Sequence, residues 1–200
     1  AQRRVTADAE RNLQQTFQTE LSSMQKIEEL RHAALADRCN TLVAKPRIHA
    51  AIEDDAIDLL YPTAKDELHD LMEGEEPPPE QAARSLHARF YRFLDDTGAV
   101  IKPPNASDVG ELDPATEAQL SLKQLPNTRQ IGYIQSAGDI HEVIAVPIFS
   151  TDTGDLVSAL VIGFKPLELE NKSTGMQSGV WVGGHLHLPV LSPSAQSSLN

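Results

Sequence analysis

The chain has 200 residues, of which 40% are hydrophobic, so it can build a packed core and is not a disordered chain. Its 17 Lys and Arg stand against 29 Asp and Glu, a net charge of −12, which argues against nucleic acid or an anionic lipid surface as a partner. Cys39 is the single cysteine, which excludes an intramolecular disulfide but not an extracytoplasmic location.

Residues 1–45 predict one long helix, because no Pro occurs before Pro46 and no Gly before Gly74. Apolar residues recur every three or four positions and so share one helix face: Val5, Ala9, Leu13, Phe17, Leu21, Met24, Ile27, Leu30, Ala34 and Leu35. Such a helix is about 65 Å long, so we expect its first turns to extend beyond the domain. We expect the second half to pack on a sheet. The first half is a candidate seam for a parallel homodimer, although its spacing is not a strict heptad.

Shorter helices are predicted between this long helix and the sheet. Pro46 ends the first helix, because proline lacks the backbone N–H. The expected helices that follow are 47–54, 63–73 and 80–87. Asp54 and Asp55 are expected to cap the start of the next helix, and Pro62 to lie at its first turn.

An antiparallel sheet of about five strands is predicted from two Asp-Thr-Gly turns, at 96–98 and 152–154, each between apolar runs. The expected strands are 88–94, 99–102, 129–136, 140–150 and 155–165. The connection 103–128 is long for a compact domain and is typical of a lid or binding loop. A helix at 114–123, capped by Asp113, is expected within it. The predicted fold class is α+β, with a long N-terminal helix and short helices packed on a five-stranded antiparallel, PAS-like sheet.

The expected domain organisation has three parts: a helical stalk and segment at 1–87, a sheet module at 88–191 and a flexible tail at 192–200. The boundary is placed at 73–79, where one Gly and three Pro interrupt the helical pattern. An irregular hairpin is expected around 183–184. The chain begins within helical sequence and ends in Ser and Asn without an evident stop, so we expect a piece of a longer protein.

Five polar or aromatic side chains on the predicted strands are candidates for binding a small molecule: Arg89, Tyr91, Arg129, Tyr133 and His141. Arg89 and Tyr91 are expected to share one face of the first strand, and Tyr133 to point the same way from the third strand. Small-molecule pockets are mostly apolar with a few placed polar groups, which these residues could supply. A half-buried Tyr or a surface Arg remains the ordinary alternative for each of them.

Two further pairs have a structural explanation that is simpler than chemistry. Asp95 and Asp96 look like paired carboxylates, but Asp at a hairpin turn bonds the backbone. His185 and His187 are spaced to share one strand face, as metal ligands would be, but no third ligand is close in sequence. The sequence also lacks a Ser/His/Asp elbow, a phosphate loop and a dinucleotide fingerprint. We therefore expect no enzymatic activity, no cofactor and no metal, and a metal-dependent enzyme using these histidines with His141 is the least favoured hypothesis.

The order of these elements, together with the segments FYRFLDDTGAVI and VIAVPIFSTDTGDLVSALVIGF, resembles the Cache family. Members of this family are PAS-like extracytoplasmic sensor domains of bacterial membrane receptors. The resemblance rests on a turn with Asp and Gly between two strands, and on later apolar strands carrying Pro and Gly-Phe. In this chain those features are Asp95–Gly98, Val146-Pro147, Gly154 and Gly163-Phe164.

The resemblance implies a periplasmic or extracellular domain of an inner-membrane receptor, which binds an unknown small molecule and signals to a cytoplasmic output domain. Transmembrane helices are then expected on both flanks in the parent chain, because no run of about 20 apolar residues lies within these 200 residues. The alternative is a cytoplasmic PAS-like module that mediates dimerisation through the long helix without a small ligand.

Overall fold

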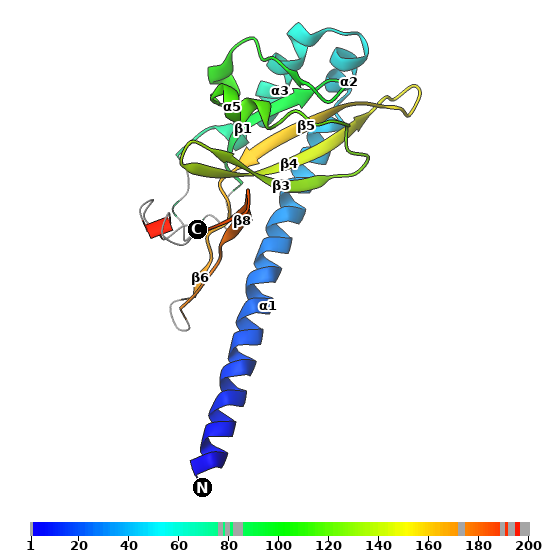
Figure 1. The fold of residues 1–200 in the computed structure, drawn as a ribbon. Helices are drawn as coiled ribbons and strands as arrows, with labels where there is room; N and C mark the ends of the chain where they lie inside the picture. Colours follow the sequence, from blue (N-terminus) through cyan, green and yellow to red (C-terminus); the bar gives the residue numbers. More distant parts are fainter. Residues whose placement is uncertain are drawn as a thin grey trace.

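A long helix crosses one face of a five-stranded sheet and extends far beyond it (Figure 1). The computed structural model describes residues 2–75, 78, 81, 86–171, 175–188, 191, 195 and 196. The helices of the first part are α1 (Gln2–Val43), α2 (Pro46–Glu53) and α3 (Ile57–Met72). The strands of the sheet are β1 (Ala88–Leu94), β2 (Val100–Ile101), β3 (Gln130–Ser136), β4 (Asp139–Phe149) and β5 (Leu156–Phe164).

Every neighbouring pair of strands in this sheet is antiparallel, and the strand order is β2-β1-β5-β4-β3. The connection between β2 and β3 contains the short 3-10 helix η1 (Ala106–Asp108) and the helix α5 (Pro114–Ala118). Two small hairpins follow the sheet: β6 (Glu170–Asn171) with β7 (Met176–Gln177), and β8 (Val180–Val182) with β9 (His185–His187). The predicted α+β fold, with its long N-terminal helix and five antiparallel strands, is confirmed.

The two Asp-Thr-Gly segments form the predicted hairpin turns. In the β1–β2 turn, Asp95 Oδ1 accepts hydrogen bonds from the backbone N–H of Thr97 at 2.9 Å and of Ala99 at 3.0 Å. Gly98 follows with a φ of 84°, a left-handed conformation that glycine adopts without a Cβ clash. In the β4–β5 turn, the N–H of Gly154 bonds the carbonyl of Ser150 at 3.0 Å. Local turn chemistry therefore explains both hairpins.

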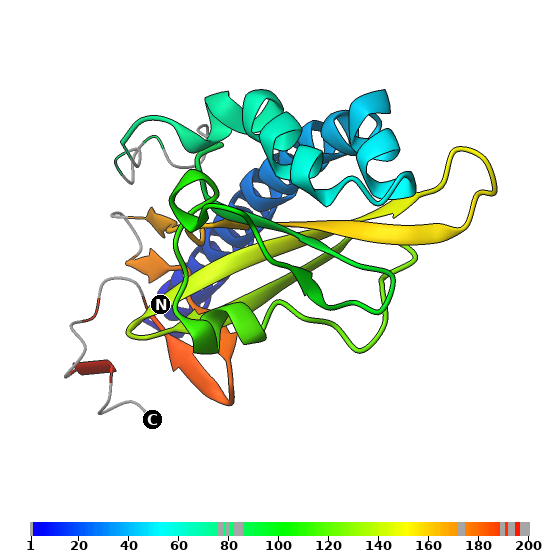
Figure 2. The ribbon, with the colours of Figure 1, turned by 90° about the horizontal axis from the view of Figure 1, so that it is seen from above.

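The sheet separates two apolar layers, with α1, α2 and α3 on one side and the β2–β3 connection on the other (Figure 2). Residues of the helical layer include Leu35, Leu42, Ile48, Leu60, Leu68, Tyr91, Phe93, Ile144 and Ile162. Residues of the connection layer include Phe90, Leu94, Leu120, Leu125, Ile134 and Val161. Because the strands alternate their side chains, one sheet supplies both layers and the helices share a core with it.

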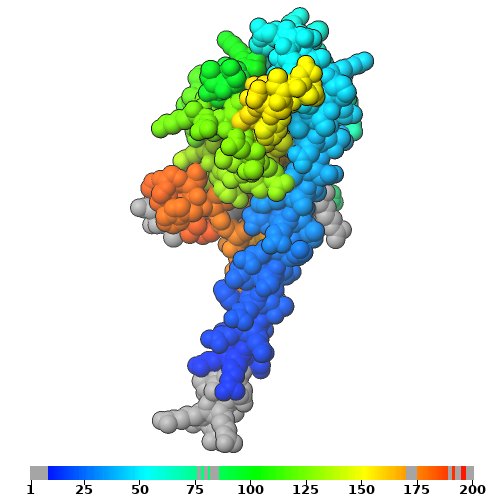
Figure 3. Space-filling model, turned by 90° about the vertical axis from the view of Figure 1, so that its right-hand side faces the viewer, coloured from blue at the N-terminus to red at the C-terminus, as the bar shows by residue number. Residues whose placement is uncertain are grey.

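The two halves of α1 have different environments. The second half is buried against the sheet and the shorter helices through Leu35, Cys39 and Leu42. The first half stands clear of the rest of the molecule (Figure 3). There Leu13 is 69% exposed and Phe17 is 51% exposed, so apolar side chains face solvent. The expected packing of the second half and extension of the first turns are confirmed.

The start of the third helix differs from the prediction. Asp54 is the C-cap of α2, and Asp55 adopts a φ of 53°, so the pair ends one helix and does not cap the next. Helix α3 begins at Ile57 and contains Pro62 within it. Asp tolerates the left-handed conformation that a helix end requires. Burial of Leu60 and Tyr61 on the core face stabilises the turn that precedes the proline.

One predicted helix is shorter than expected, and another lies largely outside the described residues. Asp113 caps α5 as predicted, but the helix ends at Ala118 and not at 123. The chain turns there because the N–H of Leu122 bonds the carbonyl of Gly98 at 2.8 Å, which ties the connection to the β1–β2 turn. The predicted helix at 80–87 falls largely on residues outside the described ones, as does most of the predicted tail at 192–200.

Gly110 and Gly138 offer a matched test of close packing between the connection and β1. Both have positive φ, 82° and 85°, but a Cβ at Gly110 would lie 2.1 Å from the carbonyl oxygen of Arg89, whereas one at Gly138 meets no atom within 4 Å. We expect G138A to cost about 1–2 kcal/mol of unfolding free energy and G110A about 3–5 kcal/mol. Urea denaturation measures both. Equal costs would mean that the connection does not lie against β1 in solution.

Candidate functional site

A buried ion network fastens α1 to β4 and to the end of β5. The carboxylate of Glu142 on β4 is 1% exposed and bonds Arg31 and His32, two consecutive residues of α1. Arg31 Nη2 also donates to the carbonyl of Lys165, just after β5, at 2.9 Å. Its guanidinium lies 5.9 Å from the ring centroid of Phe164. One helical turn of α1 is thereby bound to β4 and to the end of β5.

The charges in this network set the ionisation of its members. Burial raises the pKa of Glu142, but the bond from His32 and the charge and bond of Arg31 outweigh it, so its pKa lies below the ordinary 4.5. Tyr133 pairs with Glu142 across β3 and β4. Burial raises the pKa of Tyr133 to about 12, and the nearby carboxylates of Glu142 and Glu28 add to this rise. Glu142 is therefore ionised at neutral pH, and Tyr133 carries its proton.

A pocket, here called the hairpin pocket, lies between the β3–β4 turn and the β8–β9 hairpin. Its volume is about 460 Å³. Charged lining residues are Arg89, Asp139, Lys165 and Glu168, and the apolar ones include Ile140, Pro166, Val180, Leu188 and Leu191. His187 of β9 also lines it. This combination of an apolar wall and a few polar groups, at this volume, is typical of a small-molecule site.

Ion pairs position the charged side chains of the hairpin pocket. Arg89 Nη1 lies 2.6 Å from Asp139 Oδ2 and 3.3 Å from His141 Nδ1. Lys165 Nζ lies 3.2 Å from Glu168 Oε1. The Nε2 atom of His187 is buried and has no hydrogen-bond partner in the part of the chain that the structure describes. A buried polar atom without a partner is rare and calls for an explanation.

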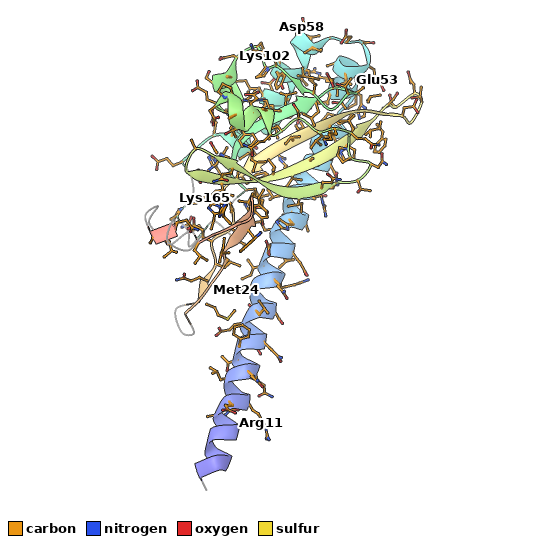
Figure 4. The ribbon with its side chains drawn as sticks, in the orientation of Figure 1. Arg11, Met24, Glu53, Asp58, Lys102 and Lys165 are labelled. Carbon is orange, nitrogen blue, oxygen red and sulfur yellow. The ribbon has the colours of Figure 1, made fainter. Side chains whose placement is uncertain are left out.

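Lys165 links the hairpin pocket to the ion network. Its side chain lines the pocket, and its carbonyl accepts the bond from Arg31. Figure 4 places Lys165 below the sheet, at the level where α1 begins to project. A molecule in the hairpin pocket would thus touch the residue whose carbonyl accepts the hydrogen bond from Arg31.

A second depression, of about 510 Å³, lies where the α2–α3, β1–β2 and β4–β5 turns meet. Its acidic residues are Glu53, Asp55, Asp95, Asp96, Asp152 and Asp155. The backbone already occupies some of these carboxylates: Glu53 accepts from the N–H of Thr151 at 2.7 Å, which lowers its pKa. A hydrogen bond from Thr97 lowers the pKa of Asp95 in the same way. The turn role expected for Asp95 is therefore observed.

Side chains fill the space between the sheet and the connection. Arg92 is fully buried and bonds Glu117 at 2.6 Å, the carbonyl of Val109 at 3.1 Å and that of Gly110 at 2.9 Å. This arginine clamps the connection onto β1. Sequence reasoning did not single it out, because an Arg within an apolar strand has no partner nearby in sequence.

The five predicted ligand residues divide between the two faces of the sheet. Arg89 and His141 come together beside the hairpin pocket. Tyr133 lies beside the ion network, and Arg129 borders a shallow groove with His32 on α1. Tyr91 packs against Tyr61 at a centroid distance of 6.1 Å, under α3. A register shift between Ala88 and Phe90 separates Arg89 from Tyr91, so they do not contact the same neighbours.

Sequence reasoning missed the ion network of Arg31, His32 and Glu142. Arg31 and Glu142 are 111 positions apart, and neither stands out in its own segment. A signal was present, because Glu142 lies in a strand whose other residues are mostly apolar. His185 and His187 lie on β9 as expected, but within the described residues no three His, Cys, Asp or Glu side chains are arranged to hold a metal ion.

A scan against known protein families and a search of curated proteins find no match to this chain. Among the described helices, none has both the length and the apolar character that crossing a membrane requires.

Replacing Glu142 by Gln tests the ion network. The amide keeps the shape but leaves Arg31 buried without its counter-charge, so we expect a loss of about 3 kcal/mol in unfolding free energy at pH 7. Because the folded-state pKa lies below 4.5, the stability from this charge is present above that pH and is lost as pH falls through the folded pKa. The difference between the two proteins should therefore shrink below about pH 4.5.

Chemical denaturation across pH measures this difference, and hydrogen exchange in α1 shows whether the helix loosens at Arg31. The control is E29Q, which removes a carboxylate that is 69% exposed and should change stability by less than about 0.5 kcal/mol. If E142Q matched this control at pH 7, the network would not hold α1 in place.

Proposed function

We propose that this chain is an extracytoplasmic ligand-sensing domain of a transmembrane signalling receptor, which couples small-molecule binding to a cytoplasmic output domain and is not itself an enzyme. One observation carries the proposal: a projecting helix is fastened to the sheet by a buried ion network that shares Lys165 with a pocket. Such an arrangement connects occupancy of the pocket to the position of α1.

The proposed mechanism needs only two arrangements of α1 on the sheet and a ligand that prefers one of them. A molecule that displaces Lys165 alters the carbonyl to which Arg31 donates. Arg31 and His32 then adjust around Glu142, and α1 shifts with them. The part of α1 before Ile27 is about 35 Å long, so a rotation of a few degrees at the network moves its far end by a few ångströms.

The Cache resemblance supports the same proposal. Its motifs fall on one sheet: the turn at Asp95–Gly98 joins β1 and β2, Val146-Pro147 lies in β4, and Gly163-Phe164 ends β5. In a receptor of this kind, α1 leads from one transmembrane segment, and the chain after β9 leads to another. Both flanking segments belong to the proposed parent chain.

We also propose that the first half of α1 pairs with a second copy of the chain. Leu13, Phe17 and Leu21 are 69%, 51% and 40% exposed, and they share one helix face. Solvent-exposed apolar side chains at helical spacing gain stability when a second helix covers them. This exposed face also favours the second candidate function, a cytoplasmic PAS-like dimerisation module without a small ligand.

Thiol labelling of the full-length protein in intact cells distinguishes these two candidates. Thr153 lies in the exposed β4–β5 turn, whereas Cys39 is 1% exposed and burial raises its pKa to about 12. We expect T153C to react more with a maleimide that cannot cross the inner membrane than the wild type does, because Cys39 is buried. Labelling of T153C only after the inner membrane is permeabilised would contradict the receptor proposal and favour the cytoplasmic module.

Sedimentation of the purified chain tests the pairing of α1. We expect the triple variant L13S/F17S/L21S to be a monomer at concentrations where the wild type is a dimer, because the apolar contact is removed. The control Q14S/Q18S alters two exposed polar positions of the same helix segment and should leave the dimer intact. A wild-type chain that sediments as a monomer at every concentration would contradict the proposed pairing of α1 between two copies.

A further inference from the structure

We infer that the hairpin pocket binds an amphipathic organic anion, with its acid group beside Arg89 and His187 and its apolar body along β8 and β9. This inference rests on the proposed sensing function, since it assigns the class of ligand that the domain would sense. It is carried by the depth of the charges in the pocket, the unpartnered imidazole and the apolar wall.

Among the described lining residues of the hairpin pocket, the two positive charges equal the two negative ones, so the exposure of each charged side chain decides which ligand is preferred. Arg89 is 20% exposed, whereas its partner Asp139 is 54% exposed. Lys165 and Glu168 are 37% and 30% exposed and offset each other. Among the described lining residues, the guanidinium of Arg89 is therefore the least exposed full charge, and arginine stays positive at every accessible pH.

Asp139 is the group that an incoming acid can replace. Its Oδ1 accepts a hydrogen bond from the N–H of Ile140 at 2.8 Å, and its Oδ2 bonds Arg89 from the solvent side. A pair with one such exposed partner contributes little to stability. A ligand carboxylate that takes the place of Oδ2 keeps the guanidinium paired, and Asp139 moves into water at little cost.

His187 supplies a second polar contact. Its buried Nε2 has no partner among the described residues, although the ring lines the same pocket as Arg89. If Nε2 carries the proton and donates it to an acid oxygen of the ligand, it gains the hydrogen-bond partner that it lacks. A purely hydrocarbon guest would leave Nε2 buried and unpaired. An ammonium group could donate to Nε2 in the other tautomer, but it would place a second positive charge beside Arg89.

The remaining wall determines the rest of the molecule. Ile140, Val180 and Leu188 line the pocket with partly buried apolar surface. Its volume of about 460 Å³ exceeds what a carboxylate alone would fill. An apolar body attached to the acid group would bury this surface and release the water that covers it.

Calorimetry on the purified chain tests the inference with three probes of equal length: octanoate, octan-1-ol and octylammonium. We expect saturable binding of octanoate, at least about tenfold weaker binding of the alcohol, and none of the ammonium. Equal binding of all three, preference for the ammonium or no binding of octanoate would each overturn the inference.

Variants locate the site and fix the sign of the charge effect. R89Q should weaken octanoate binding about tenfold or more, and H187L should weaken it several-fold. D139N should instead strengthen binding, because it removes the carboxylate that competes for Arg89. The control K26Q removes an exposed cation on α1 and should have no effect. Circular dichroism verifies that each variant is folded; unchanged binding in R89Q, or weaker binding in D139N, would overturn the site.

These measurements are independent of the receptor proposal. Absence of octanoate binding would remove the ligand assignment while leaving the T153C labelling result in force. Labelling of T153C only in permeabilised cells would remove the receptor proposal while leaving a measured affinity for the acid unaffected.

Discussion

The structure depends on one buried carboxylate. Glu142 on β4 is 1% exposed, and an ionised group so deeply buried needs partners of opposite charge, both of which come from one turn of α1. An apolar contact at this place could be equally stable, because desolvation consumes much of the gain from a buried ion pair. What the charges add is position: Arg31 and His32 are consecutive residues, so their bonds to one carboxylate narrow the range of heights and rotations that α1 can adopt on the sheet. We propose that this specificity is the reason for the network, since it sets the direction in which α1 projects.

Arg31 and Arg92, the two arginines that are buried among the described residues, differ in how many of their nitrogens have hydrogen-bond acceptors. All three nitrogens of Arg92 have acceptors, so the connection is firmly closed on its face of the sheet. Nε of Arg31 has no acceptor in the described part of the chain. A group that is not fully satisfied loses less when its surroundings rearrange, so the α1 side is the more adaptable of the two. The proposed signal therefore uses the face with the incomplete network, and the Arg92 face serves as the rigid support.

Much of the fold could be predicted because its determinants are local. Asp95 with Gly98 specifies a hairpin from a few consecutive residues, and the spacing of Leu35 and Cys39 specifies a helix face. The predicted start of α3 was wrong, because burial of residues before Pro62 outweighs the helix-breaking tendency of proline. The site was harder to predict. A bulge before Phe90 changes which face of β1 each residue occupies, and the bond from Arg31 to Glu142 joins residues that are 111 positions apart. Contacts of this kind form only when the whole chain has folded, so the periodicity of one segment cannot predict them.

The spacing on the projecting part of α1 bears on how two copies would transmit a shift. Leu13, Phe17, Leu21 and Met24 are separated by four, four and three residues, an eleven-residue pattern. This is about 3.67 residues per turn, slightly above the 3.6 of a straight helix, and such a repeat gives a shallow right-handed supercoil, whereas a heptad gives a left-handed one. In the proposed dimer, two helices that keep this spacing would wind only slightly around each other, because 3.67 lies closer to 3.6 than the 3.5 of a heptad does. Helices that wind so little around each other can turn about their own axes with little unwinding, so a small rotation at Glu142 can travel along α1 as a rotation of the whole helix.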